Sequence, residues 1–144
     1  MTSDRIPLQA AVLGYSGVLP FAALALLSLL EIPVLGRDPL QGFLIYGAVI
    51  LSFLGGIRWG SVTSSGSVQG LPLLFSVIPS LWATLLLWFV PSGLALWGMA
   101  LGFALMGLAD WARPVRGIAP WMRQLRVRLS VAVIACHLIV IFTL

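Results

Sequence analysis

Apolar residues dominate this chain in five long runs, and short clusters of polar residues, glycine or proline separate one run from the next. The runs cover residues 8–30, 39–60, 71–90, 94–109 and 125–144. An α-helix needs roughly 20 residues to cross a bilayer, which is close to the length of each run. The pattern therefore predicts an all-α protein in which one domain, residues 1–144, forms a compact bundle of about five transmembrane helices.

Charged side chains are scarce, and the scarcity excludes a soluble protein. Residues 39–109 carry a single charged side chain, that of Arg58. In the whole chain 8% of residues are charged and 60% are hydrophobic, whereas an ordinary soluble domain has about 25% charged residues. A soluble fold of this composition would expose a continuous apolar surface. The composition indicates a multi-pass membrane protein with no length left for a soluble catalytic domain.

The arginines predict the orientation in the membrane. The chain has eight Lys and Arg residues, all of them arginine, and a net charge of +4. With five crossings, seven arginines fall on one side and only Arg37 falls on the other. The positive-inside rule then predicts an inside N-terminus and an outside C-terminus. Because the arginines lie beside helix ends, we expect membrane lipids with anionic headgroups, and no nucleic acid, as partners.

Arg58 is the first candidate for a specific role, because an arginine within a membrane span costs about 3 kcal/mol on insertion scales. It lies near the inner end of the second run, so its side chain can reach the interface or pair with Asp110 at the end of the fourth run. Two interpretations stay open. The pair is a staple between two helices, or Arg58 faces a ligand that carries a carboxylate, a phosphate or a quinone oxygen.

Small residues recur at four-residue spacing, which places them on one face of a helix. Such faces favour close helix packing in membranes, where lipid supplies no hydrophobic driving force. The second and fourth runs show this spacing at Ser52, Gly56, Gly60, Gly98 and Gly102, and the third run shows it at Ser76, Ser80 and Thr84. The spacing predicts helix–helix contacts. The alternative is a narrow polar cavity between the second, third and fourth runs, in which the third run's hydroxyl groups line a pocket together with Arg58 and Asp110.

His137 is the only histidine of the chain and lies within the fifth run. A histidine in a membrane span often forms a hydrogen bond with a neighbouring helix. A proton relay or a haem ligand is the sharper alternative, but the chain has no second histidine for a bis-histidine haem. We find no catalytic pair, metal-ligand spacing or phosphate-binding glycine loop. The sequence therefore predicts no cofactor, no metal and no enzymatic activity.

The connection between the fourth and fifth runs is basic and aromatic. Tryptophan prefers the membrane interface, and arginine there is attracted to anionic headgroups by about 1 kcal/mol per residue. This segment predicts a lipid anchor, with docking onto a partner protein as the alternative. Its candidate residues are Trp111, Arg113, Arg116, Trp121, Arg123, Arg126 and Arg128.

Three segments together resemble a bacterial family of uncharacterised membrane proteins related to transmembrane protein sixty-nine. They are residues 13–17 (LGYSG) with Pro20-Phe21, residues 46–60 (YGAVILSFLGGIRWG), and Pro120-Trp121 with Leu125, Arg126 and Leu129. The resemblance spans nearly the whole chain. It implies a small protein of the bacterial inner (cytoplasmic) membrane with mitochondrial relatives in eukaryotes. It implies no activity, and because that family often has histidine at the position of Arg58, it assigns no role to this arginine.

Two functional hypotheses follow. The first is a non-enzymatic integral membrane protein that acts as an accessory or assembly component of a membrane protein complex. The second is a binder or carrier of a small molecule or a quinone-like lipid, with an inward-facing polar pocket around Arg58 and Asp110. Substitution of either residue distinguishes a helix staple from a ligand site.

Overall fold

The computed structural model describes residues 5–64, 70–112 and 119–143. In this part of the chain the regular structure consists of helices, joined by short connections, and a single isolated bridge between Val34 and Arg37. The helices are α1 (Leu8–Ser16), α2 (Leu19–Leu29), α3 (Pro39–Ser64), α4 (Gly70–Phe89), α5 (Ser92–Ala112) and α6 (Pro120–Thr143). With α1 and α2 taken as one span, five helical segments are long and apolar enough to cross a membrane. The predicted all-α membrane bundle is confirmed.

The first apolar run is broken into two helices rather than one. Pro20 occupies the first turn of α2, where its missing N–H and fixed φ are tolerated, but its ring prevents α1 from continuing through it. The backbone carbonyl of Gly17 lies at this break and accepts a hydrogen bond of 2.9 Å from the Tyr46 hydroxyl of α3. Helix α1 therefore runs in a different direction from α2, while the junction between these two helices is bonded to α3 through Tyr46.

Two helices extend past the predicted boundaries at the end of the bundle where the arginines cluster. Helix α3 continues four residues beyond Gly60, and α6 begins at Pro120, five residues before the predicted start. Proline is well suited to a first helical position because its N–H would have no intrahelical partner there. Arg123 and Arg126 consequently project from the first turns of a helix rather than from a loop.

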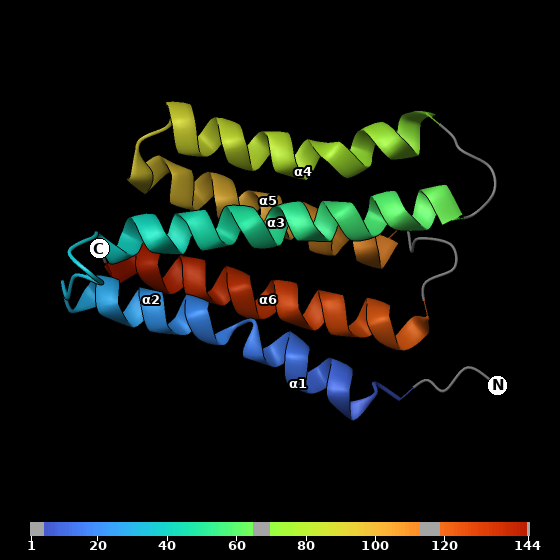
Figure 1. Cartoon of the computed structure of the whole chain (residues 1–144), viewed down its shortest axis with the longest axis horizontal. Coiled ribbons are helices and arrows are strands. Elements are labelled where there is room, and N and C mark those ends of the chain that lie inside the picture. Colours follow the sequence, from blue (N-terminus) through green and yellow to red (C-terminus); the bar gives the residue numbers. More distant parts are fainter. Residues whose placement is uncertain (1–4, 65–69, 113–118, 144) are drawn as a thin grey trace.

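Helices α2, α3, α5 and α6 form a ring of four (Figure 1). Around this ring each helix contacts its two neighbours, α2 with α3, α3 with α5, α5 with α6, and α6 with α2. Helix α4 packs outside against α3 and α5, and α1 packs against α6 and α2. Among the described residues the diagonal pair α3 and α6 has no Cα atoms within 8 Å of each other. Side chains must therefore fill the centre of the ring.

Each helix of the ring supplies one ring-bearing side chain to this centre. They are Phe21, Phe43, Phe103 and His137, and each has 0% exposure. Phe43 and His137 face each other across the diagonal, with ring centroids 4.6 Å apart in an edge-on arrangement. Phe21 contacts the other three rings, at centroid distances of 5.4 to 6.0 Å. Edge-on aromatic pairs contribute about 0.5–1.5 kcal/mol beyond burial alone, so this cluster stabilises the middle of the bundle.

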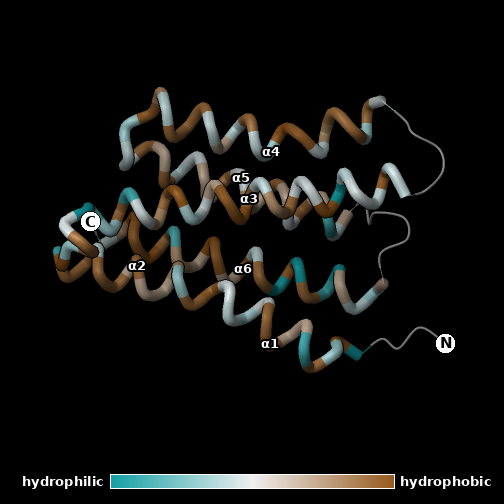
Figure 2. Tube along the Cα trace, in the orientation of Figure 1, coloured by the Kyte–Doolittle hydropathy of each residue, from teal (hydrophilic) through white to brown (hydrophobic). Residues whose placement is uncertain are grey.

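Helices α1 and α6 place the two ends of the described chain at opposite ends of the bundle, as an odd number of crossings requires (Figure 1). Hydrophilic positions lie mostly at these two ends and along the first turns of α6 (Figure 2). The arginine distribution predicts that the end where α6 begins faces the cytoplasm.

Cysteine labelling tests this orientation in a Cys136→Ala background. Leu35, at 98% exposure, lies in the connection between α2 and α3, and Thr63 is exposed near the opposite end of α3. We expect a membrane-impermeant maleimide to label Leu35→Cys in intact cells, and to label Thr63→Cys only after the membrane is opened. The reverse pattern would invert the predicted topology.

Candidate functional site

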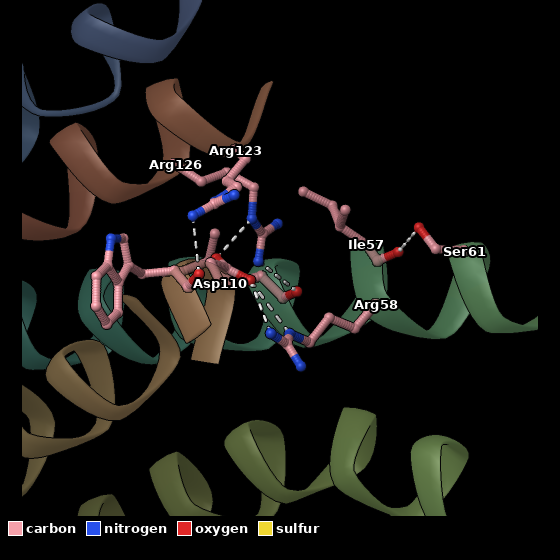
Figure 3. A network of polar contacts seen from close by, with 8 residues as sticks. Ile57, Arg58, Ser61, Asp110, Arg123 and Arg126 are labelled. Atoms are coloured by element: carbon pink, nitrogen blue, oxygen red, sulfur yellow. Dashed lines mark hydrogen bonds and ion pairs between the residues drawn. The ribbon is translucent and has the colours of Figure 1, made fainter. Parts of the chain in front are cut away.

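Asp110 of α5 lies between two arginines from different helices (Figure 3). Nε and Nη2 of Arg58, from α3, donate to its Oδ1 atom at 3.2 and 3.0 Å. Nε of Arg126, from α6, donates to its Oδ2 atom at 2.7 Å. The exposed fractions of the side chains are 4% for Asp110, 5% for Arg126 and 17% for Arg58. The carboxylate therefore holds three helices together through two ion pairs, and we call these three residues the Asp110 cluster.

The cluster also connects the two diagonal helices directly. Nη2 of Arg126 approaches the backbone carbonyl oxygen of Leu54 in α3 at 3.4 Å. Since the backbones of α3 and α6 stay apart, this long side chain crosses the interior of the ring. Arg58 lies roughly 9 Å before the end of α3, and Arg126 lies roughly 9 Å after the start of α6, at a 1.5 Å rise per residue. The cluster thus lies one to two turns inside the bundle.

The predicted pairing of Arg58 with Asp110 is present, but the prediction missed the second arginine. We expected Arg126 to face lipid or a partner, and this is wrong because its side chain is buried. Helical periodicity carries the missed signal: Arg126, Ser130, Val133 and His137 recur at three- and four-residue intervals, and all four are buried. A histidine expected inside the bundle therefore predicts an inward-facing arginine three turns earlier.

The charges of the cluster do not balance. Two guanidinium groups face one carboxylate, which leaves one excess positive charge. In addition, Nη1 of Arg126 is buried and has no hydrogen-bond partner among the described residues. A buried donor without an acceptor costs about 1–3 kcal/mol, and more when the group is charged. The cluster is therefore a helix clamp in which one buried nitrogen atom, Nη1 of Arg126, has no hydrogen-bond partner among the described residues.

Arg123 adds a third guanidinium group beside the cluster. Its Nη2 atom donates to the backbone carbonyl of Trp111 at 2.9 Å and so ties the end of α5 to α6 (Figure 3). Trp111 is 62% exposed, Trp121 is half-buried and Arg128 is exposed. Arg113 and Arg116 lie outside the described residues. Among the described interface residues, Arg126 and Arg123 therefore bond within the bundle, whereas Trp111 and Arg128 face outward.

Close helix packing occurs at some of the predicted glycines and not at others. A Cβ atom added to Gly98 would lie 2.6 Å from Leu86, and one added to Gly102 would lie 2.9 Å from Leu51. Gly56 and Gly60 have nothing within 4 Å and are exposed, so their prediction as packing positions is wrong, while Ser52 is half-buried. The four-residue spacing does place Gly56 and Gly60 on one face of α3, but that face points away from the other helices.

Gly55 is the packing glycine that the sequence reading missed. Its added Cβ would collide with the backbone carbonyl oxygen of Ser76, so α3 and α4 touch backbone to backbone. Contact of this kind requires glycine because no side chain fits between the helices. The two adjacent glycines of the GG pair thus face in different directions, and spacing alone favoured the wrong one.

The hydroxyl stripe of α4 does not face one cavity. Ser76 is buried and donates to the Leu73 carbonyl, Ser80 is half-buried, and Thr84 is exposed and donates to the Ser80 carbonyl at 2.8 Å. Serine and threonine commonly satisfy their hydroxyl groups within a membrane helix in this way. The predicted pocket lined by all three residues together with Arg58 is therefore wrong for Thr84, which lies on the outer face.

His137 is enclosed by aromatic rings rather than by polar groups of neighbouring helices. Its Nδ1 atom lies 2.9 Å from the carbonyl oxygen of Val133 in the same helix, and its Nε2 atom is buried with no hydrogen-bond partner among the described residues. A Cβ added to Gly47 would lie 3.7 Å from this Nε2 atom. The predicted hydrogen bond to another helix is therefore absent from the part of the chain described. The imidazole acts here as a packed ring.

Replacement of His137 by leucine tests this packing role. The two side chains have similar volume, and volume-conserving swaps in a core usually cost less than about 1.5 kcal/mol. Leucine also removes the unpartnered Nε2 atom. We expect the thermal unfolding midpoint in mild detergent to change by less than roughly 4 °C. A much larger loss of stability would mean that the imidazole makes a polar contact that this packing does not explain.

The fold and the Asp110 cluster define a multi-pass helical membrane protein with a buried ionic clamp. Within that class, the chain belongs to the family described as "Protein of unknown function (DUF3429)", whose model matches residues 6–142. Comparison with curated proteins and with solved structures finds no match for this chain.

Proposed function

We propose that this chain is a non-enzymatic accessory or assembly component of a membrane protein complex. The observation that carries the proposal is the use of the buried polar groups. Both carboxylate oxygens of Asp110 form ion pairs with arginines of other helices. This buried carboxylate therefore fixes how the helices are positioned relative to one another. Such a rigid bundle is suited to presenting a fixed apolar surface to other membrane helices.

The outer surface supports this proposal. Large apolar side chains cover it, among them Trp88 at 80% exposure and Trp97 at 50%. Trp97 of α5 packs edge-to-face against Phe142 of α6, with ring centroids 5.9 Å apart. This aromatic contact holds part of the outer surface in place. Aromatic side chains are favoured in the buried centres of protein interfaces. We place the protein in the bacterial inner (cytoplasmic) membrane, in agreement with the resemblance to the relatives of transmembrane protein sixty-nine.

Purification from the native membrane tests the assembly role. The chain, carrying two different affinity tags, is extracted in mild detergent and isolated on each tag in succession, and the co-purifying proteins are quantified by mass spectrometry. We expect one membrane protein complex to follow the chain through both steps at a fixed stoichiometry. Recovery of the chain alone from both steps would overturn the assembly role and favour the rival hypothesis of a small-molecule or lipid binder.

A further inference from the structure

The Asp110 cluster has more donors and more positive charge than its own acceptors satisfy. Asp110 accepts hydrogen bonds at both oxygens, yet the buried Nη1 atom of Arg126 has no partner among the described residues. The Arg126 side chain as a whole is only 5% exposed. Arg123 brings another positive charge next to the cluster. The missing element is an acceptor with negative charge.

At the end of the bundle where the cluster lies, α1 packs against α6 but not against α3. The break at Gly17 turns α1 away from α3 (Figure 1), and among the described residues no Cα atom of α1 lies within 8 Å of α3. Arg58, at 17% exposure, and Arg123, which is half-buried, lie at the same end of the bundle. Of the guanidinium groups at this end, those of Arg58 and Arg123 are therefore the ones that are partly open to the surroundings of the bundle.

We propose that the Asp110 cluster binds one phosphate group, with the Nη1 atom of Arg126 and the guanidinium of Arg58 as its donors. A guanidinium can donate to two oxygen-bearing groups at once, so Arg126 can keep its bond to Asp110 and donate to a phosphate oxygen. The phosphate comes either from the headgroup of an inner-leaflet lipid or from free inorganic phosphate. This site goes beyond the assembly role and stands independently of it.

Substitution of lysine for Arg126 separates binding from folding. Lysine keeps the positive charge and can keep the ion pair with Asp110, but it is a compact point charge that lacks the second arm of the guanidinium. The full-length chain is reconstituted in nanodiscs of phosphatidylcholine with or without phosphatidylglycerol, then released and examined by native mass spectrometry. We expect wild type to retain one phosphatidylglycerol per chain, and Arg126→Lys to retain at least about tenfold less, since a charge-assisted hydrogen bond of this kind changes affinity by that order.

Arg128→Lys is the matched comparison, because Arg128 is exposed on the same helix and makes no bond to Asp110. Equal retention in the two variants, whether unchanged or reduced, would overturn the site in favour of diffuse attraction between positive charges and headgroups. Unfolding midpoints measured in parallel show whether Arg126→Lys remains folded. If that variant unfolds, Arg58→Lys gives the same test at the more exposed donor.

Inorganic phosphate added to the detergent-solubilised chain distinguishes the two sources. We expect phosphatidylglycerol to raise the unfolding midpoint of wild type by about 5 °C, the size expected for ligand near tenfold to hundredfold above its Kd. A rise with inorganic phosphate alone, absent in Arg126→Lys, would assign the site to the free anion. No rise with either probe, together with no retained lipid, would overturn the proposal.

Discussion

Asp110→Asn is expected to destabilise the bundle more than any other single substitution that preserves side-chain shape. Asparagine leaves Arg126 and Arg58 without a counter-charge, and breaking a buried ion pair in this way costs about 3–5 kcal/mol. For a chain of this length such a loss lowers the unfolding midpoint by roughly 10 °C. Thermal unfolding in mild detergent, followed by circular dichroism, measures it.

Asp38→Asn is the matched control for this substitution. Asp38 is exposed, and its Oδ1 atom accepts a hydrogen bond of 2.9 Å from the Leu40 amide at the start of α3. Asparagine is as good a helix cap as aspartate, so we expect a change of less than about 0.5 kcal/mol. Equal midpoints for Asp110→Asn and wild type would mean that the carboxylate contributes nothing to the stability of the bundle.

Gly55→Ala is the second substitution with a large expected effect. The new methyl group would collide with the Ser76 carbonyl oxygen, which is backbone and cannot rotate away. Helices α3 and α4 must therefore separate, and overpacking of this kind costs about 1–3 kcal/mol. We expect a lower unfolding midpoint and faster proteolysis of α4 from detergent-solubilised protein.

The neighbouring Gly56→Ala provides the control, since Gly56 has nothing within 4 Å of its added Cβ. Alanine has a higher helix propensity than glycine by about 1 kcal/mol, so this variant is expected to be as stable as wild type or more stable. Because the two variants add the same methyl group one residue apart, their difference isolates the contact with α4. Equal effects of the two substitutions would show that α3 and α4 do not touch at Gly55.

The sequence allowed the membrane bundle to be predicted, because hydropathy and length depend only on the lipid environment. The five apolar runs correspond to the five spans. The break at Gly17 was not predicted even though Pro20 signals it, since proline is common in membrane helices and does not always interrupt them. The start of α6 at Pro120 was missed because tryptophan and arginine near a helix end resemble a connection.

The Asp110 cluster was predicted only in part. Asp110 is the single acidic residue after Asp38, so its pairing with Arg58 follows from the scarcity of charge. Which arginine joins the cluster depends on which face of α6 points inward. Residues 113–128 contain five arginines, and composition alone does not show which of them is buried. Likewise, four-residue spacing could not tell Gly55 from Gly56, because only the position of α4 determines which glycine it contacts.

The three sequence segments that carry the family resemblance contact one another in the folded chain. A Cβ added to Gly14 would lie 3.0 Å from Leu129 and 3.4 Å from Leu125, so the first segment packs against the last. Tyr46, from the second segment, bonds to Gly17 of the first. The three segments are therefore parts of one packing arrangement, although they lie far apart in the sequence.

A double-mutant cycle between Asp110 and Arg126 tests the ionic clamp most directly. The free energies of unfolding of Asp110→Asn, Arg126→Gln and the double variant are compared with wild type in the same detergent. A clamp predicts that the double variant loses less free energy of unfolding than the two single variants together, by about 2 kcal/mol or more. Asp110→Asn leaves Arg126 buried without a counter-charge, and Arg126→Gln removes the donor that Oδ2 of Asp110 has in wild type. Losses that add within about 0.5 kcal/mol would contradict the account, since the two side chains would then act independently.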